Sequence, residues 1–162
     1  MVGEGQLVIA AEVTIGPQDF GHLGPMVTAA RCELERVGVT EKPGTVLADS
    51  GYWHGGQMDH LTGEGIVPLV PPDSSKRDGN RPGWNSGRYR WMRSVLAGEL
   101  GAALYRRRQV MIEPVFGQIK FNRKIDRFQR RGRGAARSEW RLVAATHNLL
   151  KLHNHRLATA GP

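Results

Sequence analysis

The chain has 162 residues, which is enough for one domain with a buried core. Hydrophobic residues make up 40% of the chain and charged residues 23%, and this balance excludes a broadly disordered protein. A single cysteine excludes an intrachain disulfide, and no apolar run approaches the ~20 residues of a membrane span. We therefore expect a cytoplasmic protein with no membrane partner.

The formal net charge of +8 is distributed unevenly along the chain. Residues 1–100 carry 9 basic and 12 acidic side chains, whereas residues 101–162 carry 14 basic and 3 acidic ones. The positive excess is concentrated between Lys120 and Arg141. Such asymmetry favours a nucleic-acid partner, and the alternative is a basic protein with no such role.

Apolar runs and helical patterns alternate in the first half of the chain. The expected elements are a strand at 7–15, a helix at 23–37 with Asp19 as its cap and Gly38 as its end, a strand at 45–48, a helix at 55–62 and a strand at 66–70. This alternation predicts an α/β layer in which at least part of the sheet is parallel.

The second half is expected to be mostly helical. Residues 71–85 are rich in Pro, Gly, Ser and charge, so we interpret 71–104 as an insertion made of a loop and a helix. A second helical stretch, at 111–121, carries Pro114 in its first turn. After a basic connection, a long amphipathic helix is predicted at 135–157, with 158–162 as a disordered tail.

Two acidic residues stand out by their positions. Asp49 follows the strand at 45–48, and ligand residues collect at the carboxyl ends of parallel strands. Glu113 lies in a basic run far along the chain. Carboxylates from separate elements suit metal-dependent phosphoryl transfer. The alternatives are that Asp49 is a capping residue and that Glu113 is an acid near a helix N-terminus, where the dipole favours it.

Basic residues near Glu113 are candidates for binding DNA. Lys120 lies two helical turns after Glu113, hence on the same helix face, and can reach a phosphate. Tyr105 and Arg108, three residues apart, could address the same DNA strand. The densest basic stretch, with Phe128 inside it, favours phosphate contacts over a merely solvated face; it comprises Arg127, Arg130, Arg131, Arg133 and Arg137.

Residues 45–157 resemble the C-terminal part of the DDE transposases of bacterial insertion sequences. The resemblance rests on three segments, LADSGYW at 47–53, IEPVFGQIK at 112–120 and RSEWRLVAATHNLLK at 137–151. It implies a ribonuclease H-like mixed sheet with flanking helices, and a partial catalytic domain over residues 1–157. It also implies double-stranded DNA of transposon ends as the partner and a nucleoid-associated protein.

The resemblance further implies roles for single residues. Asp49 matches the second acid of the catalytic triad and Glu113 the third, and both would bind Mg²⁺ or Mn²⁺. Tyr105, Arg108 and Lys120 match a tyrosine–arginine–glutamate–lysine signature that positions transposon-end DNA, although four residues separate Arg108 from Glu113 where three are commonest. No residue matches the first aspartate, so we expect a chain truncated at its N-terminus, without the first strands.

Three functions are compatible with this resemblance. The first is a DNA transposase, present as an incomplete copy with little or no strand transfer of its own. The second is a non-catalytic DNA-binding fragment, in which the basic residues bind duplex DNA and the acids are structural. The third is a regulator that associates with full-length transposase, or with further copies of itself.

Overall fold

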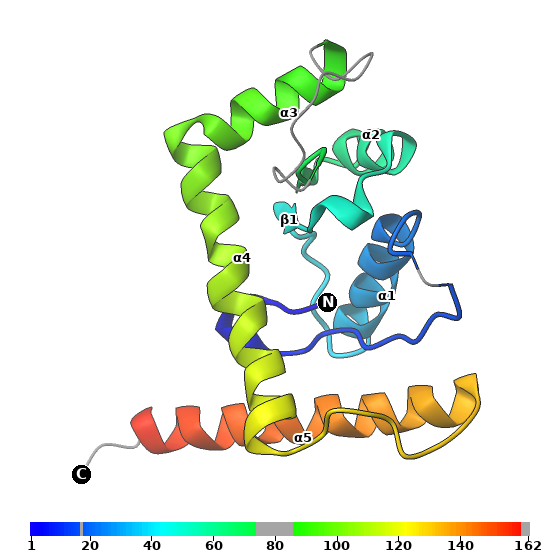
Figure 1. Cartoon of the computed structure of the whole chain (residues 1–162). Helices are drawn as coiled ribbons and strands as arrows, with labels where there is room; N and C mark the ends of the chain where they lie inside the picture. The colour runs from blue at the N-terminus through cyan, green and yellow to red at the C-terminus, as the bar shows by residue number, and fades with distance from the viewer. Residues whose placement is uncertain (17, 74–85, 160–162) are drawn as a thin grey trace. The chain divides into compact units, whose positions relative to one another are not determined.

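The computed structural model describes residues 1–16, 18–73 and 86–159 (Figure 1). The chain divides into two compact units, which we call unit 1 (Met1–Pro17 with Gln109–Pro162) and unit 2 (Gln18–Arg108). The fold is mixed α/β and mostly helical, with a small parallel sheet. None of the described helices is long and apolar enough to span a membrane. The single catalytic domain over residues 1–157 stays a prediction.

Unit 2 contains the sheet. Strand β1 (Thr45–Leu47) pairs in parallel with β2 (Val67–Leu69), and helix α2 (Gly55–Gly63) lies between them in the chain. In this register Val46 lies opposite Pro68. The structure therefore confirms the strand, helix and parallel strand predicted for this part of the chain.

Helix α1 (Leu23–Glu35) precedes the sheet in unit 2. Val27 and Ala30 are buried on one face, as the helical periodicity predicts. After the last turn Gly38 adopts a φ of +83° and its N–H donates to the Glu35 carbonyl at 3.1 Å. Glycine adopts this left-handed conformation without steric cost, so the predicted helix and its stop are both confirmed.

Helices α3 (Gly87–Ala97) and α4 (Glu99–Gly117) meet at a sharp bend at Gly98 (Figure 1). The bend brings the Val95 carbonyl very close to Gly101, where a Cβ atom would lie only 2.0 Å from the carbonyl oxygen. Glycine is therefore required by space at this position. The sequence predicts helical structure on both sides of the bend but not the break itself.

Unit 1 is built around the second part of α4 and helix α5 (Arg133–Thr159). A short 3₁₀ turn, η1 (Glu4–Gln6), and a π-helical turn, η3 (Gln118–Asn122), complete its described elements. The core joins the N-terminal segment to both helices, and its buried members are Val8, Val115, Ile119, Val143 and Ala144.

The strand predicted at 7–15 is wrong. The segment forms only an isolated antiparallel bridge between Val2 and Val8. Instead, the side-chain amide of Asn148 accepts from the Val8 N–H at 2.8 Å and donates to the Val8 carbonyl at 2.9 Å. Buried backbone groups need a partner, and this amide supplies one where no strand of the described chain does.

Two predictions fall partly outside the described residues. The loop predicted at 71–85 is described only as far as Asp73, so residues 74–85 leave it untested. The long C-terminal helix is confirmed as α5, which continues to Thr159 instead of ending at Leu157. Residues 160–162, the rest of the expected tail, also lie outside the described part.

Candidate functional site

Asp49 lies two residues after the last residue of β1, beyond the carboxyl end of the strand as predicted. Its Oδ1 accepts a hydrogen bond from the Gly51 N–H at 3.0 Å and caps the 3₁₀ turn η2 (Ser50–Tyr52). Its Oδ2 pairs with the Arg108 guanidinium at 3.3 Å. The capping role is thus observed, and because 45% of the side chain is exposed, the carboxylate also remains accessible to a ligand.

Tyr105 and Arg108 attach α4 to this end of β1 within unit 2. The Tyr105 hydroxyl donates to the Ala48 carbonyl at 3.2 Å, next to the Arg108–Asp49 pair. Arg108 is only 25% exposed, and its Nε is buried with no hydrogen-bond partner in the described chain. The two residues expected to address DNA are therefore engaged with Ala48 and Asp49, which follow β1.

A second aspartate, Asp19, lies near Asp49. The sequence predicts a different role for this residue. Asp19 was expected to cap α1, but the N-cap is His22, whose own side chain makes no capping hydrogen bond, and Gln57 Oε1 instead accepts from the Gly24 N–H in the first turn at 2.9 Å. Burial raises the pKa of Tyr52, and the negative charges of Asp19 and Asp49 raise it further, as does a hydrogen bond to Asp19. No feature of the sequence points to this proximity, which depends on the tertiary fold.

Tyr105 responds to the same local charges. Burial raises the pKa of its hydroxyl, the Arg108 guanidinium lowers it, and the carboxylate of Asp49 raises it. The net shift is upward, so the hydroxyl keeps its proton and acts as a hydrogen-bond donor to Ala48 at neutral pH.

Glu113 belongs to unit 1 and is exposed. The helix predicted to begin at Met111 in fact begins at Glu99, so Glu113 lies in the C-terminal half of α4. The explanation of Glu113 as an acid placed at a helix N-terminus is therefore wrong, because the dipole favours a negative charge only in the first turn. Glu113 forms no ion pair with any described residue.

Pro114 lies inside α4 instead of in its first turn. Proline has no N–H, so the Val110 carbonyl one turn earlier loses its helical partner. The Gln6 side chain replaces that partner, with Nε2 donating to the Val110 oxygen at 2.9 Å. Gln6 also contacts α5, because its main-chain carbonyl lies 3.0 Å from His147 Nε2. The helix turn that carries Glu113 is thus stabilised by the N-terminal segment.

Lys120 lies on the π-helical turn η3 and is exposed. The wider π turn places it at a different angle around the helix from the one that regular α-helical spacing from Glu113 predicts. Its Nζ lies 5.6 Å from the centre of the Phe116 ring, a cation–π arrangement. The charge remains open to an anionic ligand.

The basic stretch divides into two groups. Arg127, Arg130 and Arg131 are exposed and form no ion pair within the described residues. Arg133 donates to the Val13 carbonyl at 3.2 Å, and Arg137 pairs with Glu12 at 2.8 Å. The first group is free to bind phosphate, whereas the second is engaged with the N-terminal segment.

The two acids expected to bind the metal lie in different compact units. Asp49 belongs to unit 2 and Glu113 to unit 1. Within the described ranges, no three His, Cys, Asp or Glu side chains gather closely enough to hold a metal ion. Both residues nevertheless offer accessible carboxylate oxygens, which are the ligands that Mg²⁺ and Mn²⁺ prefer. The donor chemistry fits a hard cation.

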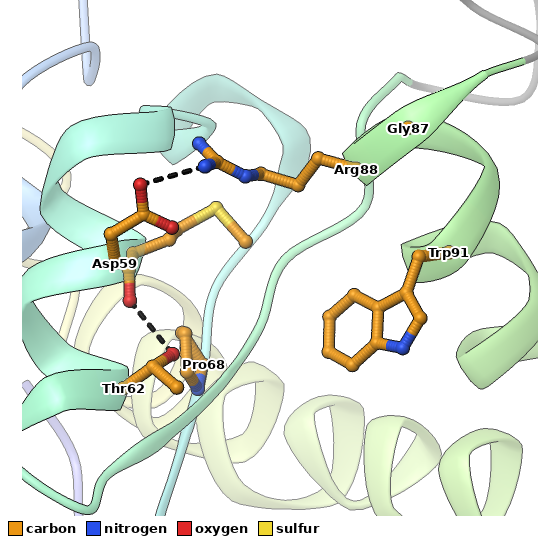
Figure 2. Close-up of a pocket in the computed structure, with 7 residues that line it drawn as sticks. Asp59, Thr62, Pro68, Gly87, Arg88 and Trp91 are labelled. Atoms are coloured by element: carbon orange, nitrogen blue, oxygen red, sulfur yellow. Dashed lines mark hydrogen bonds and ion pairs between the residues drawn. The ribbon is translucent and has the colours of Figure 1, made fainter.

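A surface hollow of about 340 Å³ lies elsewhere in unit 2, between α2, β2 and α3 (Figure 2). Trp91 faces it across from Pro68, and Arg88 pairs with Asp59 at 2.7 Å on its rim. No residue assigned to a site from the sequence lines this hollow. Two of its lining residues, Gly87 and Arg88, follow closely in the sequence after residues 74–85, which the structure does not describe.

Residues 80–153 match the family described as the transposase DDE domain. This segment is similar to transposase DDE domains and covers less than half of the chain. It includes Tyr105, Arg108, Glu113, Lys120 and all five arginines of the basic stretch, and it begins after Asp49. No curated protein and no solved structure matches the chain. The resemblance to DDE transposases is confirmed by the family match, and members of this family bind DNA and use divalent metal ions.

Proposed function

We propose that the chain is part of a DNA transposase of an insertion sequence, acting in DNA cleavage and strand transfer at the element's ends. The observation that carries this proposal is the DDE domain match over residues 80–153, because it includes Glu113 in a segment where its carboxylate is exposed and unpaired. An acid kept free of ion pairs on a basic helix is suited to a metal ion and a phosphodiester.

Asp49 and Glu113 are the two acids that we assign to the metal site, with Mg²⁺ or Mn²⁺ as the ion. The bound metal would neutralise charge at the phosphodiester and activate the attacking oxygen. Around it, Lys120 would hold a phosphate, and Arg108, with Tyr105, would position DNA close to Asp49. The family also requires a first aspartate that no residue here matches, so we expect little or no strand transfer by this polypeptide alone.

The remaining sequence-based predictions belong to the same proposal. The parallel pair β1–β2 with α1 and α2 would be part of a ribonuclease H-like sheet. Double-stranded transposon ends would be the partner, and the protein would be bound to the nucleoid. Association with full-length transposase or with further copies of the chain stays a prediction.

Mn²⁺ binding measured by titration calorimetry tests the assignment of the acids. We expect Glu113→Gln and Asp49→Asn each to weaken Mn²⁺ binding by at least tenfold, because each removes one charged ligand (about 1.4 kcal/mol per factor of ten). Glu99→Gln, on the same helix, is the matched control and should bind as the wild type does.

Equal Mn²⁺ binding by the wild type and both variants, all of them folded, would contradict the metal assignment. A non-catalytic DNA-binding protein would then be the better explanation. The exposed, unpaired guanidinium groups of Arg127, Arg130 and Arg131 specifically favour that second function, because phosphate contacts need no metal.

A further inference from the structure

Three aromatic side chains gather on unit 1 from three different elements. Phe116 comes from α4, Phe128 from the connection between η3 and α5, and Trp140 from α5. The Phe116 and Trp140 rings are nearly parallel, at 10°, with centroids 6.3 Å apart. Phe128 meets Trp140 edge-on at 6.4 Å and 77°. We call these three residues the aromatic cluster.

The aromatic cluster is open to solvent on one side. Phe116 is 41% exposed and Phe128 46% exposed, whereas Trp140 is half-buried and packs against the core of unit 1. Part of the Phe116 side chain and part of the Phe128 side chain therefore remain accessible to a ligand.

Positive charge surrounds these exposed rings. Lys120 lies over the Phe116 ring at 5.6 Å, and Arg127 and Arg130 flank Phe128 in the chain. Neither arginine forms an ion pair within the described residues, and both are exposed. A ligand that binds the aromatic cluster is therefore expected to carry both negative charge and flat apolar surfaces.

The connection that carries Phe128 is held in place by α5. The carboxylate of Glu139 accepts from the main-chain N–H of Gln129 at 2.9 Å and from that of Arg130 at 3.0 Å. Hydrogen bonds of this kind, with a charged acceptor, are stronger than neutral ones. They hold the backbone beside Phe128, so less of this connection has to be ordered when a ligand binds.

We propose that the aromatic cluster binds unpaired DNA, with bases stacked on Phe116 and Phe128 and phosphates held by Lys120, Arg127 and Arg130. Exposed aromatic rings with interleaved cations are the arrangement by which proteins bind single-stranded nucleic acid without reading its sequence. The inference deepens the proposed DNA-binding function by naming single-stranded DNA as a ligand, and it requires neither Asp49 nor Glu113.

Fluorescence anisotropy with a labelled oligo(dT) of about 12 nucleotides tests the proposal, beside a duplex of equal length, in EDTA. Phe128→Leu keeps the apolar volume but removes the ring. We expect it to weaken oligo(dT) binding about tenfold and to change duplex affinity less than twofold. Phe128→Tyr keeps the ring and should bind oligo(dT) as the wild type does. Phe20→Leu, an exposed phenylalanine of unit 2, is the control.

Different outcomes separate this inference from the proposed function. If Phe128→Leu and Phe116→Leu bind oligo(dT) as tightly as the wild type, the stacking proposal is wrong, even where duplex binding persists. Tighter binding of a matching oligo(rU) than of oligo(dT) would overturn the assignment to DNA. Absence of binding to either form of DNA by the wild type would overturn the stacking proposal and the proposed transposase function together.

Discussion

Asn148 does for the extended segment around Val8 what a neighbouring strand would do. Its amide is both donor and acceptor, so it satisfies both main-chain groups of one residue. The apolar, β-branched composition of residues 7–15 predicts a buried strand, whereas only Val8 and Ala10 of this segment are buried and no strand forms. It could not reveal that the hydrogen-bonding partner is a single side chain 140 positions away.

We expect Asn148→Leu to lower the free energy of unfolding by about 2 kcal/mol, because it leaves a buried N–H and a buried carbonyl without partners. The matched control is Asn154→Leu, since Asn154 is exposed on the same helix. Urea denaturation of both variants measures the difference. Equal stability of the two variants would show that water replaces the amide at no cost.

Asp49 and Glu113 illustrate how much of the site could be predicted from single residues. Asp49 was placed correctly, because a short apolar run followed by Asp-Ser-Gly defines both the strand and its end. Glu113 was identified as a candidate, but its helix was misplaced. The misplacement has a physical cause, since Pro114 is usual in a first turn and is tolerated inside α4 where Gln6 supplies the lost hydrogen bond.

Among the elements, the bend between α3 and α4 depends on Gly101. The Val95 carbonyl occupies the space that a side chain would need. Periodicity predicts one helical stretch over residues 88–104, across the bend, and a separate one from Met111, because a bend created by contact between main-chain atoms leaves no trace in a pattern of apolar residues. For this reason the sequence predicts where helical structure occurs better than it predicts the residues at which each helix begins and ends.

Gly101→Ala is expected to destabilise the protein by about 2 kcal/mol, because the new methyl group overlaps a main-chain oxygen that cannot move independently. Gly117→Ala provides the contrast. Its backbone is helical, with φ −58° and ψ −49°, and no atom lies within 4 Å of the added Cβ. It should raise stability by up to about 1 kcal/mol. Thermal unfolding followed by circular dichroism ranks the two variants, and the reverse order would contradict the structure.

At the scale of the whole molecule, folding stability is expected to depend on pH through Glu12. Burial alone would raise the pKa of Glu12, but hydrogen bonds and charge interactions from Arg141 and Arg137 outweigh it and lower the pKa below 4.5. A carboxyl whose pKa is lowered in the folded state stabilises that state above its unfolded pKa. The contribution is lost as the pH falls through the lower, folded-state value.

Glu12→Gln should therefore unfold at a lower temperature than the wild type at pH 7, and the difference should shrink as the pH falls below about 4.5. Glu41→Gln is the control, because Glu41 is exposed and forms no ion pair within the described ranges. Melting temperatures measured between pH 3 and pH 7 (roughly the interval around a carboxyl pKa) test this. A constant difference across that interval would show that charge is not the reason.

The pair between Arg108 and Asp49 would also link the metal binding and the DNA binding proposed for these residues. Arg108 pairs with Asp49 Oδ2, so a cation that binds this oxygen would compete with the guanidinium. A released guanidinium finds its best alternative partner in a phosphate group. Occupancy by the cation and occupancy by DNA would then favour each other by the same factor, because such coupling is reciprocal. Arg108 would therefore disfavour binding of the metal ion to Asp49 when no DNA is bound.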